Sequence, residues 1–313
     1  MSTTCIPADG PAPPGRRVAD GLPSPQTERG GTLYVVATPI GNLGDITLRA
    51  IEVLRDVPLI AAEDTRLTRR LLERHAIETR SISFHARSAP ARLEELVAHL
   101  RGGADLALVT DAGTPVISDP GSDLVARWAA EGGRVVPIPG ASAVLAAVAG
   151  SGVAGPRWTF EGFLPRSGRE RRERIAAIAG DTRGTVLFEA PGRVVATLRD
   201  LAAACGADRP GAIARELTKV HEQIERGTLG ELAVALADGT ILTRGEFVIV
   251  VGMGEVASGA TARGDDLVAA RAAVERLVAE GIARGEAARR VAADTGIPRR
   301  RLYGASERTA DDT

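Results

Sequence analysis

The chain has 313 residues, of which 44% are apolar and 25% are charged, and its formal net charge is -1. This composition supports a buried core in a soluble protein and excludes a chain that is fibrous or disordered throughout. No apolar run reaches the ~18 residues of a membrane span, and the N-terminus lacks the basic-then-apolar order of a signal peptide, so we expect a cytoplasmic protein without a membrane segment. Cys5 and Cys205 are the only cysteines. They are too few for a disulfide framework or a zinc cluster, and we expect no metal or redox chemistry.

The first half of the chain predicts an α/β domain. Residues 1–30 contain six prolines and four glycines with almost no large apolar residue, and we expect a disordered tail there. From Thr32 onward, short apolar runs alternate with stretches of helical period. Strands are predicted at 32–37, 58–62, 81–84, 105–110 and 134–138, and helices at 46–55, 66–75, 90–101, 121–131 and 141–150. This alternation is typical of a parallel sheet covered by helices, so residues 31–150 form the N-terminal domain.

The second half predicts a further α/β domain and a small appendix. Gly150, Gly152, Gly155 and Pro156 interrupt the pattern and suit a linker. Strands are then predicted at 158–163, 184–189, 211–217 and 246–252, with helices near 168–180, 193–204 and 229–237. We assign 151–256 to this second domain, with a mixed sheet. Residues 263–308 have helical period, ten arginines and seven acidic residues, which predicts a basic helical module.

Polar loops follow four of the five strands predicted in the N-terminal domain. They are Thr38–Asp45, Glu63–Arg66, Asp111–Gly121 and Pro139–Ala143. Ligands bind beyond the carboxyl ends of the strands in an open parallel sheet, where these loops would converge. Turn formation or helix capping could account for any one of them, but not for the eleven special residues of Asp111–Gly121. Because neither GxxxxGK[ST] nor an early GxGxxG is present, we expect an adenosine-like ligand without a triphosphate.

Two charged segments lie in the predicted second domain. Lys219 is the only lysine among 39 basic residues, and it lies in the run Arg215–Glu222 after a predicted strand. The segment Pro165–Arg174 carries five arginines. Each segment could be no more than a solvated surface, or the first could be part of a site and the second could contact an anion or RNA.

Six motifs occur in order over about 225 residues: TPIGNLGDITLRA, AEDTRLTRRLL, DAGTPVISDPG, PGASA, FEGFLP and RELTKVHE. Together they resemble the tetrapyrrole-methylase superfamily, and specifically the bacterial 16S ribosomal RNA cytidine-2'-O-methyltransferases. The DTGIPRRRLY segment resembles the C-terminal helical module of that family. The resemblance implies two α/β domains that enclose S-adenosylmethionine, a homodimer, and methyl transfer to a ribose hydroxyl in the decoding region of 16S ribosomal RNA or the assembled small subunit. Where the family usually has Glu-Ser-Pro-His-Arg, this chain has Ala190 and Gly192 in place of Ser and His.

The resemblance and the loops together predict three sets of site residues. Lys219 is the first candidate for a base, since a desolvated lysine can lose its proton where arginine cannot; Glu216 and Asp64 are the alternatives. The cofactor-binding residues are expected to be Pro39, Asp111, Gly113, Thr114, Pro115, Gly140, Ser142, Ala143 and Leu217. The RNA-binding residues are expected to be Arg66, Arg166, Arg169, Arg171, Arg172, Arg299 and Arg300. Two other functions are weighed: methylation of a small tetrapyrrole on the same fold, and a non-catalytic RNA-binding role in assembly.

Overall fold

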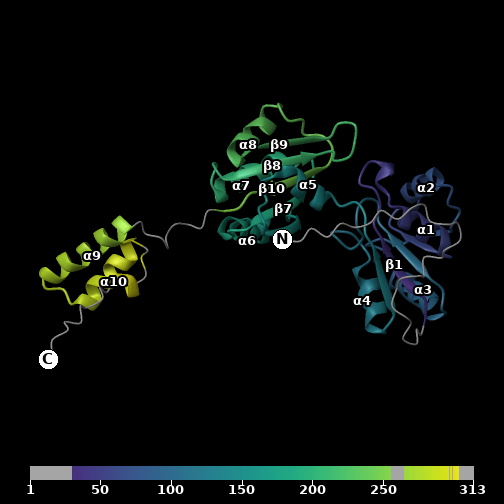
Figure 1. Cartoon of the computed structure of the whole chain (residues 1–313), viewed down its shortest axis with the longest axis horizontal. Helices are drawn as coiled ribbons and strands as arrows, with labels where there is room; N and C mark the ends of the chain where they lie inside the picture. Colours follow the sequence, from purple (N-terminus) through teal and green to yellow (C-terminus); the bar gives the residue numbers. More distant parts are fainter. Residues whose placement is uncertain (1–29, 255–263, 296, 298, 303–313) are drawn as a thin grey trace, which may run out of the picture. The chain divides into compact units, whose positions relative to one another are not determined.

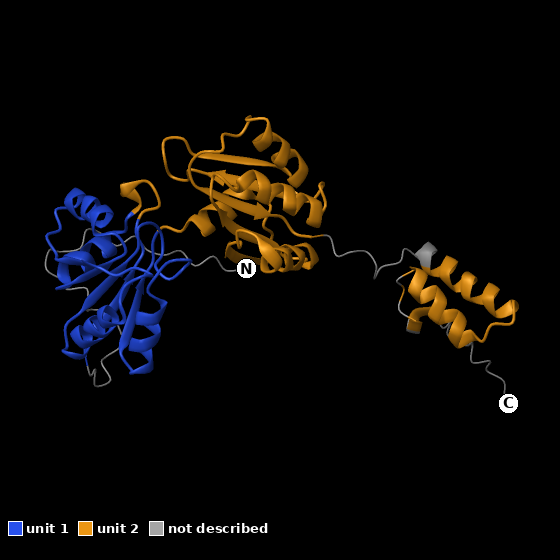
Figure 2. Ribbon diagram, turned by 180° about the vertical axis from the view of Figure 1, so that it is seen from behind, with its two compact units in different colours: residues 1–38, 46–140 blue, residues 39–45, 141–313 orange. Residues whose placement is uncertain are grey.

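The computed structural model describes residues 30–254, 264–295, 297 and 299–302. Its contacts divide the chain into two compact units, shown in Figure 2. Unit 1 holds the described residues up to Thr38 together with Ile46–Gly140, and unit 2 holds Pro39–Asp45 and the residues from Ala141 onward. The tail expected at 1–30 lies almost wholly outside the described residues.

Unit 1 is built on a five-stranded parallel sheet with the order β3-β2-β4-β1-β5. The strands are β1 (Thr32–Val36), β2 (Ile60–Ala62), β3 (Ser81–Ser83), β4 (Leu106–Val109) and β5 (Arg134–Ile138). Between them run α1 (Leu48–Asp56), α2 (Thr65–Arg74), α3 (Pro90–Arg101) and α4 (Ser122–Ala130), and a short 3-10 helix, η1 (Leu43–Asp45), precedes α1. The predicted parallel α/β domain is confirmed in its strands and in these four helices.

Helices cover both faces of the unit 1 sheet, which is why its inner strands β2 and β4 are continuously apolar and buried. Val53 and Leu54 of α1 pack with Ile60 and Val109 on one face. On the other face, α3 and α4 contribute a second cluster that includes the fully buried Trp128. The sheet is therefore held as a rigid layer, and its strand ends project loops from one edge.

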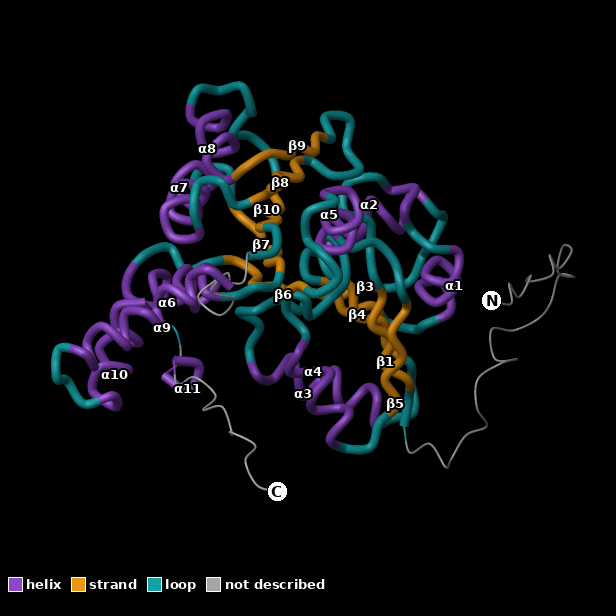
Figure 3. Tube along the Cα trace, turned by 60° about the vertical axis from the view of Figure 1, so that its left-hand side comes forward, coloured by secondary structure: helices purple, strands orange, loops and turns teal. Residues whose placement is uncertain are grey.

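Unit 2 is built on a mixed sheet with the order β6-β7-β10-β8-β9, visible with its helices in Figure 3. Only β6 and β7 are parallel, and the other neighbouring strands pair antiparallel. The strands are β6 (Trp158–Phe163), β7 (Gly184–Glu189), β8 (Pro210–Arg215), β9 (Gln223–Thr228) and β10 (Phe247–Val251). The mixed sheet is confirmed, but β9 was not predicted, because QIERGT lacks an apolar run and pairs at the sheet edge with β8 alone.

Four helices cover the two faces of the unit 2 sheet. Helices α6 (Gly168–Gly180), α7 (Val194–Cys205) and α8 (Leu229–Ala237) bury one face. On the other face lies α5 (Ala143–Ser151), whose Val144 and Ala147 pack against Val186 and Val248. We had expected α5 to close the N-terminal domain, yet its apolar side chains contact the second sheet, so the boundary between the units falls after Gly140.

A buried arginine ties the C-terminal end of α6 to the sheet of unit 2. The side chain of Arg209 is almost inaccessible, and three of its nitrogens donate to backbone carbonyl oxygens. The acceptors belong to Gly252, Ile178, Ala179, Asp181 and Arg183. A guanidinium suits this position because its planar fork supplies five donors at once, close to the negative end of the helix dipole.

The described part of the C-terminal module is helical, as predicted. It consists of α9 (Gly264–Ala279), α10 (Arg284–Thr295) and α11 (Arg299–Leu302), labelled in part in Figure 1. Ala270, Val274, Ala288 and Leu302 are buried in a core that these helices share among themselves. The rest of the predicted 263–308 segment lies outside the described residues.

Candidate active site

The loop after β4 is held in an unusual backbone conformation. Gly113 has a φ of 84°, and the non-glycine residues Val116 and Ser118 have φ values of 67° and 66°. The loop is fixed to the end of β1 by paired backbone hydrogen bonds between Thr38 and Gly113, and the Thr38 hydroxyl donates to the carbonyl oxygen of Thr110. Left-handed backbone at branched or polar residues is costly, and such conformations concentrate at binding sites.

Acidic side chains gather at the carboxyl ends of β2 and β4. The Thr110 hydroxyl lies 2.6 Å from Oε2 of Glu63 and also hydrogen bonds with Asp119. The Asp111 carboxylate accepts from the backbone N–H of Asp64 at 2.9 Å. Burial, and then the nearby charge of Glu63, raise the pKa of Asp119 to about 6, and the same two causes raise the pKa of Asp111. This edge therefore favours a cationic or proton-donating ligand.

Asp64 is tied to Arg66 on the surface of unit 1. Its carboxylate caps α2 by accepting from the Arg66 N–H at 2.8 Å, and it forms an ion pair with the guanidinium at 2.6 Å. The Arg66 hydrogen bonds lower the pKa of Asp64 to about 2. The lowered pKa makes Asp64 a weak proton acceptor, which counts against its candidacy as the base.

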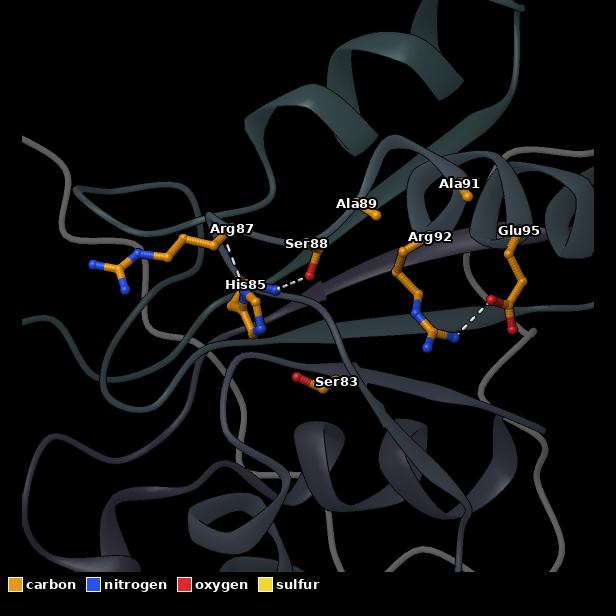
Figure 4. Close-up of a pocket in the computed structure, with 8 residues that line it drawn as sticks. All are labelled: Ser83, His85, Arg87, Ser88, Ala89, Ala91, Arg92 and Glu95. Carbon is orange, nitrogen blue, oxygen red and sulfur yellow. Dashed lines mark hydrogen bonds and ion pairs between the residues drawn. The ribbon is translucent and has the colours of Figure 1, made fainter.

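Two adjoining pockets lie at the carboxyl ends of β2, β3 and β4. The larger, of about 590 Å³, is lined by Glu63 and Asp119 together with residues that follow β3. The smaller, of about 380 Å³, is drawn in Figure 4 and is lined by Arg87 and Arg92 among others. His85 lines both pockets. An acidic hollow therefore adjoins a basic one on the same strand ends.

In unit 2, Lys219 lies among carboxylates. Its Nζ is 2.8 Å from Oε1 of Glu216 and 3.1 Å from Oε2 of Glu246. Burial lowers the pKa of Lys219, but the hydrogen bonds that its ammonium donates to Glu216 and Glu246 outweigh burial, so the pKa is raised above its ordinary value. The Lys219 hydrogen bond likewise lowers the pKa of Glu216. The lysine is thus held as an ammonium ion, contrary to the lowered pKa that a lysine base requires.

The backbone around Lys219 is also constrained. Glu216 and Thr218 have φ values of 49° and 65°. The Thr218 hydroxyl accepts from the N–H of Asn42 at 3.1 Å, which joins this turn to the loop that follows β1. At Gly41, an added Cβ would lie 2.5 Å from Cγ of Lys219, so only glycine lets the two segments approach this closely. Asn42 and Lys219, the sole representatives of their types, therefore lie in one cluster.

The predicted cofactor-binding residues are distributed over several loops. Asp111 and Gly140 are exposed, Thr114 is half-buried and Pro115 is buried. Ser142 caps α5 by accepting from the N–H of Leu145, and Ala143 is the first residue of that helix. In unit 2, Pro39 is buried and Leu217 packs in the same core as Ile40.

The predicted RNA-binding arginines divide by exposure. The side chain of Arg66 is 87% exposed, and Arg166, Arg169, Arg172 and Arg299 are also exposed. Arg171 is buried instead, where it donates to Thr197 and forms an ion pair with Asp200 at 2.8 Å. The Arg171 guanidinium is thus already paired inside unit 2, which argues against the RNA contact predicted for it. The side chain of Arg300 lies outside what the structure describes.

Glu189 is buried at the start of the segment in which this chain has Ala190 and Gly192 instead of the Ser and His usual in the family. Its carboxylate forms an ion pair with Arg193 at 3.0 Å and accepts from the Thr197 hydroxyl at 2.6 Å. A Cβ at Gly192 would meet open space. The Glu and Arg that remain in this chain thus form a structural pair, and Gly192 leaves it undisturbed.

Comparison with known proteins decides the family. Residues 32–233 match the family described as Tetrapyrrole (Corrin/Porphyrin) Methylases. The chain belongs to this family. The part of the chain that the structure describes contains no helix long and apolar enough to cross a membrane, and no group of three or more His, Cys, Asp or Glu residues that could hold a metal ion.

Individual relatives extend the comparison beyond the family. A Synechocystis protein named Ribosomal RNA small subunit methyltransferase I is 45% identical over 273 residues, which cover 87% of this chain and 96% of that protein. A Bacillus subtilis protein of the same name is 39% identical, over 88% of this chain and 94% of its own length. The resemblance inferred from the six motifs is thus confirmed.

Solved structures show the same fold at low sequence identity. A cobalt precorrin-4 methyltransferase superposes with a TM-score of 0.55 at 18% identity, covering 71% of this chain and 94% of its own. A Thermus thermophilus uroporphyrin-III C-methyl transferase, complexed with S-adenosyl homocysteine, has a TM-score of 0.52 at 18% identity and covers 71% and 97%. The predicted tetrapyrrole-methylase fold is confirmed.

Proposed function

We propose that this protein transfers a methyl group from S-adenosylmethionine to the 2'-hydroxyl of a cytidine in 16S ribosomal RNA. Identity of 39–45% with proteins named Ribosomal RNA small subunit methyltransferase I, over nearly their whole length, carries this proposal. As the resemblance implies, we propose that it acts as a homodimer in the cytoplasm. The small tetrapyrrole alternative has weaker support, because the tetrapyrrole methyltransferases of known structure described above are 18% identical to this chain.

We propose that the loop after β4 binds S-adenosylmethionine. The ligand needs hydrogen bonds to a sugar and to a cationic amino acid end, and Asp111 offers an exposed carboxylate with a raised pKa beside exposed backbone of Ala112. Gly113 holds the turn in a left-handed conformation that strands do not adopt. When bound, the ligand supplies an electrophilic methyl group, so the protein has to orient the reacting groups and exclude water.

We propose that Lys219 acts as a cation toward the ribose oxygen. A ribose hydroxyl is a poor nucleophile, and a fixed ammonium near it favours the charge that develops as its proton leaves. Glu216 and Glu246 hold Nζ at 2.8 Å and 3.1 Å and keep it protonated. The raised pKa thus changes the role first expected for this residue, from a base to an electrostatic stabiliser.

Two matched substitutions test the cofactor loop. Gly113 and Gly103 have φ values of 84° and 86°, so alanine strains both backbones alike, and a Cβ at 103 meets open space. We expect Gly113→Ala to weaken the calorimetric affinity for S-adenosylmethionine at least tenfold, and Gly103→Ala to leave it within twofold. Equal affinities in the two variants would show that the loop after β4 does not hold the ligand.

A transfer assay tests the function itself. Purified protein is incubated with labelled S-adenosylmethionine and with small ribosomal subunits or free 16S ribosomal RNA. We expect the label on the 2'-oxygen of one cytidine. Lys219→Arg should retain part of the turnover because it keeps the positive charge, and Lys219→Met should lose about two orders of magnitude, as for a removed oxyanion donor. Label on a base atom, or on neither RNA, would refute the proposal.

A further inference from the structure

The larger pocket of unit 1 has a chemical character that the proposed function leaves unused. We call it the carboxyl pocket and define it by Glu63, Phe84, His85, Ser118 and Asp119 among its lining residues. Its volume of about 590 Å³ is ample for one nucleotide, and it opens at the carboxyl ends of β2, β3 and β4, where ligands bind to parallel sheets. None of these residues belongs to the sets predicted for cofactor, catalysis or RNA.

The hydrogen bonds of Thr110 indicate which polar groups the carboxyl pocket offers to a ligand. The Thr110 hydroxyl has one proton and lies between two carboxyl groups, donating to Glu63 at 2.6 Å and hydrogen bonding with Asp119. The Thr110 hydrogen bond lowers the pKa of Asp119, so it favours the ionised carboxylate, whereas burial and Glu63 oppose ionisation. Both Glu63 and Asp119 line the pocket, and each carboxylate has two oxygens, so both residues can also accept hydrogen bonds from a ligand.

The neighbouring pocket presents the opposite chemistry. The exposed side chain of Arg87 has no ion-pair partner among the residues that the structure describes, and in Figure 4 it extends away from the Arg92–Glu95 pair. Nδ1 of His85 accepts from the N–H of Arg87 at 3.1 Å, which leaves the ring proton on Nε2 as a donor. The carboxylates of Glu63 and Asp119, which can accept from an amino group, thus lie next to a pocket whose Arg87 can donate to a phosphate.

We propose that the carboxyl pocket receives the base of the target nucleotide, and that Glu63 and Asp119 accept hydrogen bonds from the exocyclic amino group of cytosine. This inference rests on the proposed function. Carboxylates are the groups that read the N4 amine of cytosine, whereas uracil has a carbonyl oxygen there and would be repelled. The exposed side chain of Arg87 is placed to meet the phosphate of the same nucleotide or of its neighbour.

Discrimination between cytidine and uridine tests the pocket directly. Substrates are small ribosomal subunits that have either cytidine or uridine at the position the wild-type enzyme methylates, and the measured quantity is the ratio of the two kcat/KM values. A good base contact contributes roughly 5- to 150-fold in discrimination. We expect Asp119→Asn and Glu63→Gln each to reduce the ratio at least fivefold, because an amide adds a donor that suits the uracil oxygen.

Glu52→Gln is the matched control. Glu52 lies on α1, is exposed and lines neither pocket, so Glu52→Gln removes a negative charge without altering the carboxyl pocket or Thr110. We expect it to keep the wild-type ratio, and all three variants to keep the wild-type affinity for S-adenosylmethionine. An unchanged ratio in both Asp119→Asn and Glu63→Gln, or an equal change in Glu52→Gln, would overturn the inference. Failure of the wild-type enzyme to methylate the cytidine subunit would instead overturn the proposed function.

Discussion

Adding one methyl group at Gly41 should displace Lys219 from its ion pairs without substituting any charged residue. Carbon atoms normally approach to ~3.5 Å, whereas a Cβ at Gly41 would lie 2.5 Å from Cγ and 3.1 Å from Cε of Lys219. The lysine side chain must therefore move by about 1 Å or change rotamer. Its ion pairs at 2.8 Å and 3.1 Å cannot both survive such a displacement.

The expected loss of activity follows from that displacement. A misplacement of ~1 Å in a catalytic group can cost about 100-fold in rate, so we predict that Gly41→Ala lowers single-turnover methyl transfer by about 10- to 100-fold. The added methyl would also lie 2.9 Å from Oγ1 of Thr218, so the free energy of unfolding should fall by about 1–3 kcal/mol. Affinity for S-adenosylmethionine should stay within twofold of wild type.

Gly44→Ala is the control in the same loop. A Cβ there would lie 3.2 Å from Oδ1 of Asn42, a contact that a small rotation of the amide relieves. We expect its turnover to stay within about threefold of wild type. If Gly41→Ala were as active as Gly44→Ala, the position of Lys219 would not matter to the chemistry, and the role we assign to it would be refuted.

Three further predictions address stability, pH and RNA binding. Arg209→Lys should destabilise unit 2 by about 3 kcal/mol in denaturant unfolding, because one ammonium group cannot reach all the carbonyl oxygens that the guanidinium satisfies; a loss under 1 kcal/mol would contradict this. Since folding raises the pKa of Asp119 to about 6, the folded chain binds the extra proton between pH 3.8 and 6, and the ionised carboxylate costs stability above that window. Asp119→Asn should therefore gain about 1 kcal/mol relative to wild type, after solvent screening, as the pH rises from 4 to 7, and a constant difference would be the contrary result. A chain ending at Ser258 should keep its affinity for S-adenosylmethionine and its oligomeric mass but bind RNA with a weaker salt dependence; an unchanged salt slope would mean that the C-terminal module does not dock RNA.

Every strand predicted from the sequence contains apolar residues in a short run, and the clearest predictions are the strands that are buried on both faces. TLYVV and LALV read as buried strands because nothing else places such residues in a short run, and both were found within a residue of their predicted bounds. QIERGT has no such run, since it forms an edge strand. For α5, helical period indicates a helix but not which sheet it contacts, so its packing on unit 2 could not be read from the chain.

The sequence predicts which loops carry the candidate site, but it does not predict the direction in which the pKa values of the side chains shift. Spacing placed polar residues after β2 and β4, which topology then brings to one sheet edge. The partners of Lys219 include Glu246, which lies 27 positions away and follows a different loop, and its charge reverses the expected direction of the lysine pKa. Thr110 is the last residue of the strand predicted at 105–110. Only the folded structure shows that its hydroxyl hydrogen bonds with both Glu63 and Asp119.

A map of ribose methylation in 16S ribosomal RNA tests the central claim most directly. The RNA is taken from cells that lack this protein and from the same cells supplied with the wild type or with Lys219→Met. We predict that one 2'-O-methylcytidine is missing without the protein, returns with the wild type and stays missing with Lys219→Met. A map that is the same in all three, or a missing methyl group that had been on a base, would contradict the account.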